Sequence, residues 1–346
     1  MSYSRILTVA ALALFATAFA AAPHATAQVE GYHISKTVPL PGNGGWDYLA
    51  GDPANNRLYI SHGDEVLVLN MSDAKLVGTI SGLHSTHGIA VSDKDGHGFI
   101  TNGGNQTVTE FDIKTLAKLK DIPAPKDVDG IIYDPSTDRV FAFCGDANQA
   151  IAIDAKTGDV AGTIDLGGGP EFAAADGRGH VFNVLEDKSE ILDIDAHSLK
   201  ILNRYPLAPC EGPSGVSIDA EHHRVFAGCH NGVVAIVNAD TGKVIATPKI
   251  GVGVDASRFD PNQQLLFTSQ RDGTISVFHE DSPDQFKSLG DIKTETGART
   301  MEINPKTGTI YTVTAKSGQA PAAAPGGRRQ RPPMVPGSFH LLVITK

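Results

Sequence analysis

Seven positions spaced about 42 residues apart carry side chains that could bind a ligand together, and six of them are ionisable. They are Asp47, His87, Asp129, Glu171, Ser214, Asp255 and Arg299. Carboxylate oxygens favour Ca²⁺ or Mg²⁺, whereas an imidazole nitrogen admits Zn²⁺ or another transition metal. We therefore consider a divalent cation as cofactor, with the following candidate ligands: Asp47, Asp129, Glu171 and Asp255, beside His87.

The same side chains allow two other interpretations. Four carboxylates around one axis repel each other unless they stay hydrated, share protons or bind a cation. Arg299 could pair with Asp255 or Asp47, or hold an anionic group of a substrate. In an enzyme, His87 or Glu171 would act as general base and Arg299 would stabilise an anionic intermediate near the cation. The plainest alternative is a hydrated polar channel without a ligand.

An aromatic residue recurs at nearly the same interval and indicates which fold positions these side chains. The seven aromatic residues are Tyr59, Phe99, Phe141, Phe182, Phe226, Phe267 and Tyr311. Each lies in the second of four short apolar strands, which are separated by turns of Asp, Asn, Gly and Pro. This period predicts an all-β fold, a seven-bladed β-propeller with four-stranded antiparallel blades.

The last repeat lacks its outer strand, because the chain ends at Lys346 soon after the third strand. The missing strand is expected at the other end of the chain, where the segment from Thr37 to Leu40 resembles the segment from Arg204 to Leu207. Residues 32–38 would then complete the last blade. This closes the ring and pairs an otherwise exposed edge.

The repeat register places the ionisable positions on one face of the propeller. The first strand of each blade lines the central axis, and its first residues face one mouth of the channel. Each ionisable position lies five residues before the turn that ends this strand, as Asp129 does before Asp134. A mouth residue is thus expected from every blade.

A second ring lies three residues beyond each periodic aromatic and is expected on the same face. Its members are His62, Asn102, Cys144, Leu185, Cys229, Gln270 and Thr314, with His230 and Arg271 directly after two of them. His62 and His230 are added to the ligand-binding candidates. On the opposite face, the turn that contains His222 and His223 is expected to be solvated.

The three cysteines are Cys144, Cys210 and Cys229. Cys210 and Cys229 both map to the mouth side of one blade, and an exported protein meets oxidising conditions. We expect a disulfide between these two and a free Cys144. The alternative is a soft-metal site formed by Cys144, His62 and His230, although their spacing is not a known metal motif.

The chain begins with the features of a cleaved export signal. Arg5 precedes an apolar stretch at residues 6–22, and Ala25, Thr26 and Ala27 form a site for cleavage after small residues. We expect a mature protein that begins at Gln28, consists of one propeller domain over residues 28–346, and is periplasmic or secreted. Residues 316–338, rich in Ala, Pro, Gly and Arg, are expected to form a flexible insertion in the last blade.

The net charge of the chain and the lack of common catalytic motifs limit which partners and substrates we expect. The formal net charge is −10 at pH 7, which opposes binding to a nucleic-acid backbone. Single-stranded nucleic acid could meet only the cluster Arg328, Arg329 and Arg331, and few aromatic residues are available for stacking. The chain has no His-Glu-x-x-His motif, Walker loop or Gly-x-Ser-x-Gly elbow. We expect a monomer that binds a small molecule or a protein partner.

The repeats resemble the YVTN-type, or YncE-like, β-propeller family over about residues 32–346. The resemblance depends on the Pro-x-Gly-x-x-x-Asp segment from Pro213 to Asp219 and on the Thr-Gly-Lys turn from Thr241 to Lys243. The Tyr-Val-Thr-Asn box of the family is degenerate here, and its nearest forms are Tyr59 to His62 and Phe99 to Asn102. The resemblance implies an exported seven-bladed propeller and no particular ligand.

Two functional hypotheses follow. The first is an exported binding or scaffold protein, whose charged channel mouth holds a small ligand, a metal or a partner. The second is a metal-dependent hydrolase or lyase acting on a lactone or an ester through the same ring. The fold does not decide between them, because propellers carry many unrelated activities.

Overall fold

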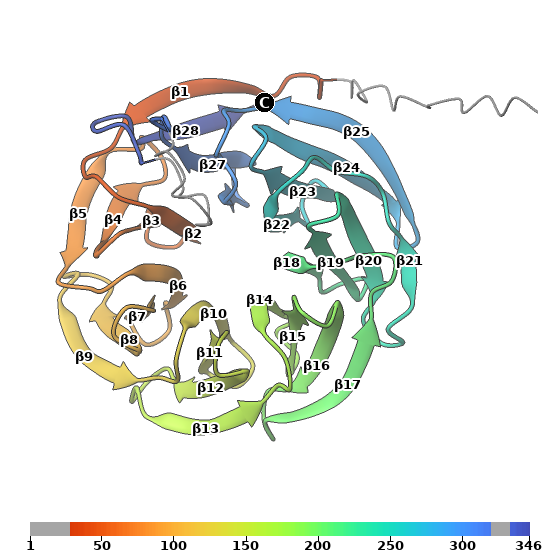
Figure 1. Ribbon diagram of the computed structural model, residues 1–346, viewed down its shortest axis with the longest axis horizontal. Helices are drawn as coiled ribbons and strands as arrows, with labels where there is room; N and C mark the ends of the chain where they lie inside the picture. Colours follow the sequence, from red (N-terminus) through yellow and green to blue (C-terminus); the bar gives the residue numbers. More distant parts are fainter. Residues whose placement is uncertain (1–27, 320–332) are drawn as a thin grey trace, which may run out of the picture.

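The protein is a ring of seven four-stranded antiparallel sheets around a central axis (Figure 1). The computed structural model describes residues 28–319 and 333–346. The predicted fold class is thereby confirmed. Within the described part of the chain, no helix has the length and apolar character that crossing a bilayer requires. The expected export signal at residues 1–27 lies outside the described residues, as do residues 320–332 of the expected insertion.

The first four blades follow the chain from the innermost to the outermost strand. Blade 1 contains β2 (Trp46–Asp52), β3 (Arg57–His62), β4 (Glu65–Asn70) and β5 (Leu76–Ser81). Blade 2 contains β6 (Thr86–Ser92), β7 (His97–Asn102), β8 (Thr107–Asp112) and β9 (Lys118–Pro123). Blade 3 contains β10 (Val128–Asp134), β11 (Arg139–Cys144), β12 (Gln149–Asp154) and β13 (Val160–Asp165). Blade 4 contains β14 (Pro170–Ala175), β15 (His180–Leu185), β16 (Glu190–Asp195) and β17 (Lys200–Pro206).

The last three blades continue in the same order until the ring closes. Blade 5 contains β18 (Pro213–Asp219), β19 (Arg224–Cys229), β20 (Val233–Asn238) and β21 (Val244–Ala246). Blade 6 contains β22 (Val254–Asp260), β23 (Leu265–Gln270), β24 (Thr274–Ser282) and β25 (Gln285–Lys293). Blade 7 contains β26 (Met301–Asn304), β27 (Thr309–Thr314), β28 (His340–Thr345) and β1 (His33–Pro39).

The N-terminal strand β1 closes the ring, as predicted. It pairs antiparallel with β28, so that Thr37 lies opposite Leu342, and Figure 1 shows it outermost beside β28. Tyr32 and Leu40, which flank β1, are buried in two different core clusters. The first strand of the chain therefore supplies both the missing hydrogen-bonding edge and apolar contacts on either side.

The periodic aromatic residues form the core between neighbouring blades. Six of the seven are at most 1% exposed and Phe182 is 3% exposed. Tyr311 also donates a hydrogen bond from its hydroxyl to the Met71 carbonyl oxygen at 2.6 Å, which joins blade 7 to blade 1. The same side chains that mark the repeat in the sequence thus hold adjacent blades together.

Each inner strand from blade 1 to blade 6 has a register shift beside its mouth residue, as between Val128 and Ile131 around Asp129. Such a bulge turns an extra side chain away from the sheet. The inner strands approach so closely that a Cβ at Gly88 would lie 2.7 Å from the Ile131 side chain, and one at Gly215 would lie 2.7 Å from the Ala256 backbone. Glycine is required at these positions by close approach.

A disulfide joins Cys210, in the segment before β18, to Cys229 at the end of β19, with their Cα atoms 5.6 Å apart. Cys144 is a free, buried cysteine. The bridge is confined to blade 5 and connects its inner-strand entry to its second strand. It therefore reinforces the mouth side of that blade.

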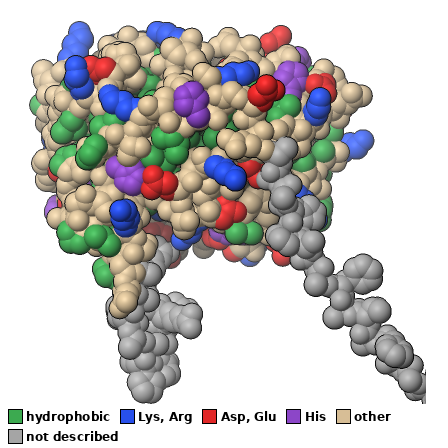
Figure 2. Space-filling model, turned by 90° about the horizontal axis from the view of Figure 1, so that it is seen from above, with side chains coloured by type: hydrophobic (Ala, Val, Ile, Leu, Met, Phe, Trp, Pro, Cys, Tyr) green, Lys and Arg blue, Asp and Glu red, His purple; other side chains and the backbone are tan. Residues whose placement is uncertain are grey.

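The outer surface of the ring is mixed in character. On the side seen in Figure 2, acidic, basic and histidine side chains are interspersed with hydrophobic groups. Most outer strands expose one or two large apolar side chains, for example Leu119 on β9 and Leu202 on β17. Scattered single exposures of this kind are normal for a monomeric protein surface.

The closure predicts what happens when β1 is removed. A chain that begins at Pro41 leaves β28 with an unpaired edge and exposes the core residues that Tyr32 and Leu40 cover in the complete ring. It should therefore lose about 3 kcal/mol or more of unfolding free energy and associate through the unpaired edge. Urea unfolding and size-exclusion chromatography measure both effects, with a chain that begins at Gln28 as control. Equal stability of the two chains would contradict the closure.

Candidate functional site

The mouth residues of six blades come together at one end of the central axis. They surround a cavity of about 430 Å³ that is lined by Asp47, His87, Asp129, Glu171, Asp255 and Arg299, among others. The first five are each the second residue of their inner strand, and Arg299 lies two residues before β26. Blade 5 contributes Ser214, which is 2% exposed. The structure thus places all seven predicted positions at one mouth.

Buried polar side chains of the neighbouring strands fix the backbone of these residues. Thr101 donates to the Asp129 carbonyl oxygen at 2.6 Å, and the Asn183 amide donates to the Glu171 carbonyl oxygen at 2.9 Å. Thr300 donates to the Asp47 carbonyl oxygen at 2.6 Å. The second strands and the neighbouring blade therefore hold the mouth residues in place before any ligand arrives, which is preorganisation.

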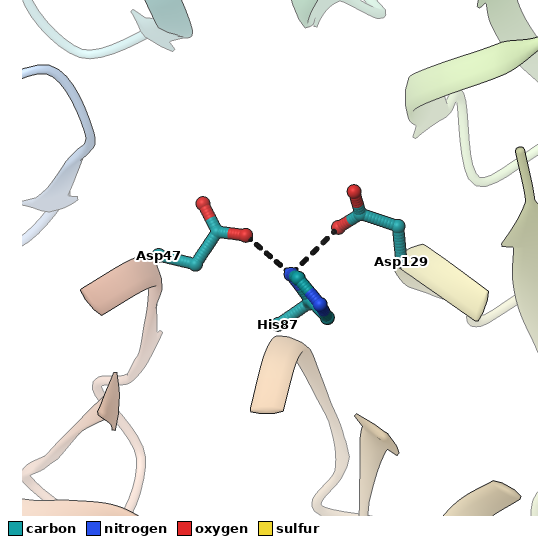
Figure 3. Close-up of side chains that lie close together, drawn as sticks. All are labelled: Asp47, His87 and Asp129. Carbon is teal, nitrogen blue, oxygen red and sulfur yellow. Dashed lines mark hydrogen bonds and ion pairs between the residues drawn. The ribbon is translucent and has the colours of Figure 1, made fainter. Parts of the chain in front are cut away.

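Three residues from consecutive blades meet on one side of the mouth. The His87 Nδ1 atom lies 2.7 Å from Asp47 Oδ2 and 3.5 Å from Asp129 Oδ1, and Figure 3 shows both carboxylates pointing at the imidazole. One potential ligand atom from each residue lies within 4.8 Å of the others. This arrangement fits either a protonated imidazole between two carboxylates or a divalent cation bound by all three groups.

Arg299 neutralises the adjoining part of the ring. Its Nε atom lies 2.9 Å from Asp255 Oδ2, and its Nη2 atom lies 3.3 Å from Asp47 Oδ1. Nη2 also donates to the Trp46 carbonyl oxygen at 3.2 Å. The expected pairing of Arg299 is therefore formed with both aspartates rather than with one of them.

The four carboxylates do not form one ligand cluster, and this corrects the four-carboxylate metal site expected from the sequence. Asp129 contacts His87, Asp255 is paired with Arg299, and Asp47 contacts both cations. Glu171 and Asp255 lie on either side of Ser214, whose hydroxyl is 3.5 Å from each of them. His87 and Arg299 thus pair with three of the carboxylates and share Asp47, while Glu171 pairs with neither cation.

Burial and mutual repulsion shift the pKa values of the acids upward. Burial and nearby Asp129 raise the pKa of Glu171 to about 9, and burial and nearby Asp47 raise the pKa of Asp129 to about 7. Burial also raises the pKa of Asp255, against the opposing effect of Arg299. Glu171 is therefore protonated at neutral pH, which does not fit the role of general base considered above.

The pKa of His87 is raised, whereas the pKa of an ordinary buried imidazole is lowered. Burial alone would lower its pKa, but the hydrogen bond to Asp47 and the charge of Asp129 raise the pKa to about 9. The imidazole is cationic at neutral pH when no metal is bound. The mouth then carries His87 and Arg299 as cations, and these balance the ionised carboxylates.

An aromatic pair that the sequence analysis did not predict lies beside the mouth. The rings of Tyr48 and Phe172 lie 3.8 Å apart, and both residues are less than 10% exposed. Tyr48 lines the mouth cavity and also a second axial cavity of about 240 Å³. The Arg258 guanidinium lies 5.9 Å from the Phe172 ring on that second side. Tyr48 thus lies between two cavities on the axis and contacts Phe172 there.

A sequence signal for this pair existed. The residue after each mouth position is small in five blades, namely Gly88, Gly130, Gly215, Ala256 and Thr300. In the other two blades it is Tyr48 and Phe172, both from inner strands that turn toward the axis. An interruption of a ring of small residues by two aromatic residues could have predicted that these two side chains meet.

Of the second ring and the two residues that follow it, only Arg271 lines the mouth cavity. His62 is 2% exposed and stacks on Phe339 with ring centroids 4.5 Å apart, so it belongs to the core. His230 is half exposed at the rim, where its Nδ1 atom lies 3.1 Å from Glu186. Both were expected as ligand-binding residues, and neither lines the mouth cavity.

The soft-metal alternative is wrong for the same reason. Within residues 28–319 and 333–346, only two groups of three or more potential ligands are close enough to share a metal ion, and Cys144, His62 and His230 form neither. Cys144 is fully buried within blade 3, and His62 packs in the core of blade 1. Blade geometry keeps these side chains apart.

The second of these groups lies in the turn that was expected to be solvated. The His222 Nδ1 atom lies 2.6 Å from Asp219 Oδ2 and 3.2 Å from Glu280 Oε1, and both acids are at most 3% exposed. Burial and nearby Asp219 raise the pKa of Glu280 to about 7. His222 therefore links blade 5 to blade 6 instead of pointing into solvent.

The fold and the site together define a seven-bladed, WD40-like β-propeller. The chain matches no protein-family model and no curated protein. The resemblance to YVTN-type repeats consequently stays a prediction.

Solved structures share the fold at low sequence identity. U3-55K is 10% identical with a TM-score of 0.74, over 89% of this chain and 98% of that one. The WD40 repeats of RRP9 are 10% identical with a TM-score of 0.74, over 88% and 96%. Hydrazine synthase of Kuenenia stuttgartiensis is 16% identical with a TM-score of 0.69, over 83% and 96%. At these identities the likeness shows the fold alone.

The raised pKa of Glu171 predicts a pH-dependent stability. Between its ordinary value of 4.5 and about 9, the folded protein holds a proton that the unfolded chain has released, so stability falls as the pH rises through this window. Glu171→Gln removes this loss and should stabilise the protein by about 1–3 kcal/mol at pH 9, with little effect at pH 5.

Urea unfolding at the two pH values measures this difference, and Glu211→Gln, at an exposed position, is the matched control. An equal effect of Glu171→Gln at pH 5 and pH 9 would show that the carboxyl group titrates normally.

Proposed function

We propose that this protein is an exported binding propeller whose channel mouth holds a divalent cation through Asp47, His87 and Asp129. The observation that carries this proposal is the convergence of one ligand atom from each residue within 4.8 Å. Two carboxylates and one imidazole suit Zn²⁺ or Mn²⁺ better than an all-oxygen cation such as Ca²⁺. Ligand positions left open on the side facing the cavity would receive water or a bound small molecule.

The prearranged backbone of the mouth supports binding. Thr101 and Thr300 hold the carbonyl groups of Asp129 and Asp47 in place, which presets the ligand positions. A cation bound here would replace the His87 proton as the charge between the two aspartates. Metal binding then releases protons, so it becomes tighter as the pH rises.

Metal titration tests the cation site. Isothermal titration calorimetry with Mn²⁺ and Zn²⁺ should show one site, tighter at pH 8.5 than at pH 6.5. Asp129→Asn should weaken it by at least about tenfold, since even outer-shell changes cost that much. Asp146→Asn, which removes an exposed carboxylate from the β11–β12 turn, is the matched control. Equal metal affinity of the wild type and Asp129→Asn would show that the mouth is not the cation site.

The hydrolase or lyase alternative depends on the same cation. Protonated Glu171 across the cavity is a potential general acid, and Arg299 is placed to stabilise an anionic intermediate. Turnover of lactones or esters by the metal-loaded protein in the same titration samples would favour this alternative over simple binding.

We infer further that the protein is periplasmic or secreted, that its repeats are of the YVTN type, and that it functions as a monomer without nucleic acid. The features of residues 1–27 and the Cys210–Cys229 disulfide support export, and the net charge of −10 opposes nucleic-acid binding. The segments from Pro213 to Asp219 and from Thr241 to Lys243 support the repeat type, and the scattered exposed apolar side chains support a monomer. Export should yield a chain that begins at Gln28, as mass spectrometry of the secreted protein can show. A full-length chain retained in the cytoplasm would contradict it.

A further inference from the structure

A second pocket opens beside the mouth and has a different chemical character. Its volume is about 660 Å³, which is in the range of small-molecule sites. Loops of blades 1, 6 and 7 form it, through Gly44 and Gly45 before β2, Thr296 and Gly297 before β26, and Ser317 after β27. It shares Trp46, Arg271 and Arg299 with the mouth cavity, so the two spaces adjoin.

The pocket is cationic in an acidic protein. Arg271, Arg299 and Lys316 line it, and among the described residues no Asp or Glu does. The neighbouring mouth, by contrast, contains Asp47, Asp129, Glu171 and Asp255. Arg299 is already paired with Asp255 and Asp47 on its other side, so Arg271 and Lys316 supply the further positive charge that can attract an anion here.

Two buried donors on the shared wall lack acceptors. Neither Arg299 Nη1 nor Trp46 Nε1 has a hydrogen-bond partner among the described residues. Buried polar groups are nearly always paired, and an unpaired one costs free energy. Both orphans are N–H donors, which favours a ligand that brings acceptor oxygens.

The pocket also has a rigid apolar part. The Trp46 ring stacks on Phe339 with centroids 5.6 Å apart, and Ala315 and Met334 lie on the same lining. A Cβ built on Gly45 meets nothing within 4 Å, so the space in front of this wall is open. A small molecule with an aromatic or other apolar body fits such a wall.

We propose that this pocket binds the oxyanion of a small organic acid or phosphate ester, held by Arg271, Arg299 and Lys316, with its apolar body against Trp46. The ligand would extend toward the adjoining mouth. This ligand class deepens the proposed function and rests on it, because the pocket and the cation site share the wall formed by Trp46, Arg271 and Arg299. Lys316 lines the anion pocket and not the mouth cavity, whereas Arg271 lines both, and neither residue is one of the three cation ligands.

Trp46 makes the test direct, because it is the only tryptophan in the chain. Its fluorescence is titrated with phenyl phosphate, benzoate and the neutral benzyl alcohol. We expect a saturable change with one or both anions and none with benzyl alcohol. A stronger response to phenyl phosphate assigns a phosphate ester, and a stronger response to benzoate assigns a carboxylic acid.

Charge-neutralising variants locate the binding site. Arg271→Gln and Lys316→Gln, both at exposed positions, should each weaken anion binding roughly tenfold. Lys200→Gln on the outer strand β17 removes the same charge elsewhere and should change nothing. Gly45→Leu, which places a side chain in the open space, should abolish the fluorescence response.

Failure of this proposal can be told apart from failure of the cation site. No fluorescence change with either anion, equal binding of benzyl alcohol, or unchanged affinity in Arg271→Gln and Lys316→Gln would overturn the anion pocket, whatever the result with Mn²⁺. Asp129→Asn should not weaken the anion response, because its carboxylate is outside this pocket.

Discussion

The approach of seven inner strands to one axis is the constraint on which the site depends. Their spacing leaves no room for a Cβ at Gly88 or Gly215. A register shift lies beside the mouth residue of the inner strand in blades 1 to 6. The ring thus brings one residue of each blade to the mouth, and the sequence determines which of these residues are charged.

The negative charges of the mouth carboxylates lie close together and must be neutralised by nearby cations or by protons. Arg299 forms ion pairs with Asp255 and Asp47, and His87 forms ion pairs with Asp47 and Asp129, so each cation neutralises part of the charge of two carboxylates. Glu171 has no such partner, and its pKa accordingly rises to about 9. The mouth is near electrical balance when protons occupy Glu171 and His87, and it becomes a cation site only when a metal replaces the imidazole proton.

The fold was readable from the sequence because it repeats. Aromatic residues such as Tyr59 and Phe141 pack at equivalent positions in every blade, so one period predicted seven blades and the closing role of β1. The mouth positions were readable for the same reason. A count within the repeat specifies a place in the ring, since all blades share one backbone geometry.

Interactions between blades could not be read in this way. The division of the carboxylates by Arg299 and His87, the contact of Tyr48 with Phe172, and the link from His222 to Glu280 all join side chains about one period or more apart. The position of a residue within the repeat predicts the face of the propeller on which it lies, but it does not predict the direction of its side chain. For that reason His62 was placed at the mouth, whereas its ring stacks in the core on Phe339.

The most direct test of the central claim is a crystal structure of the mature protein grown with Mn²⁺ and measured at a wavelength where manganese scatters anomalously. We predict one anomalous peak at the mouth, within coordination distance of Asp47, His87 and Asp129. A mouth without a peak, with the His87 imidazole still between the two carboxylates, would contradict it.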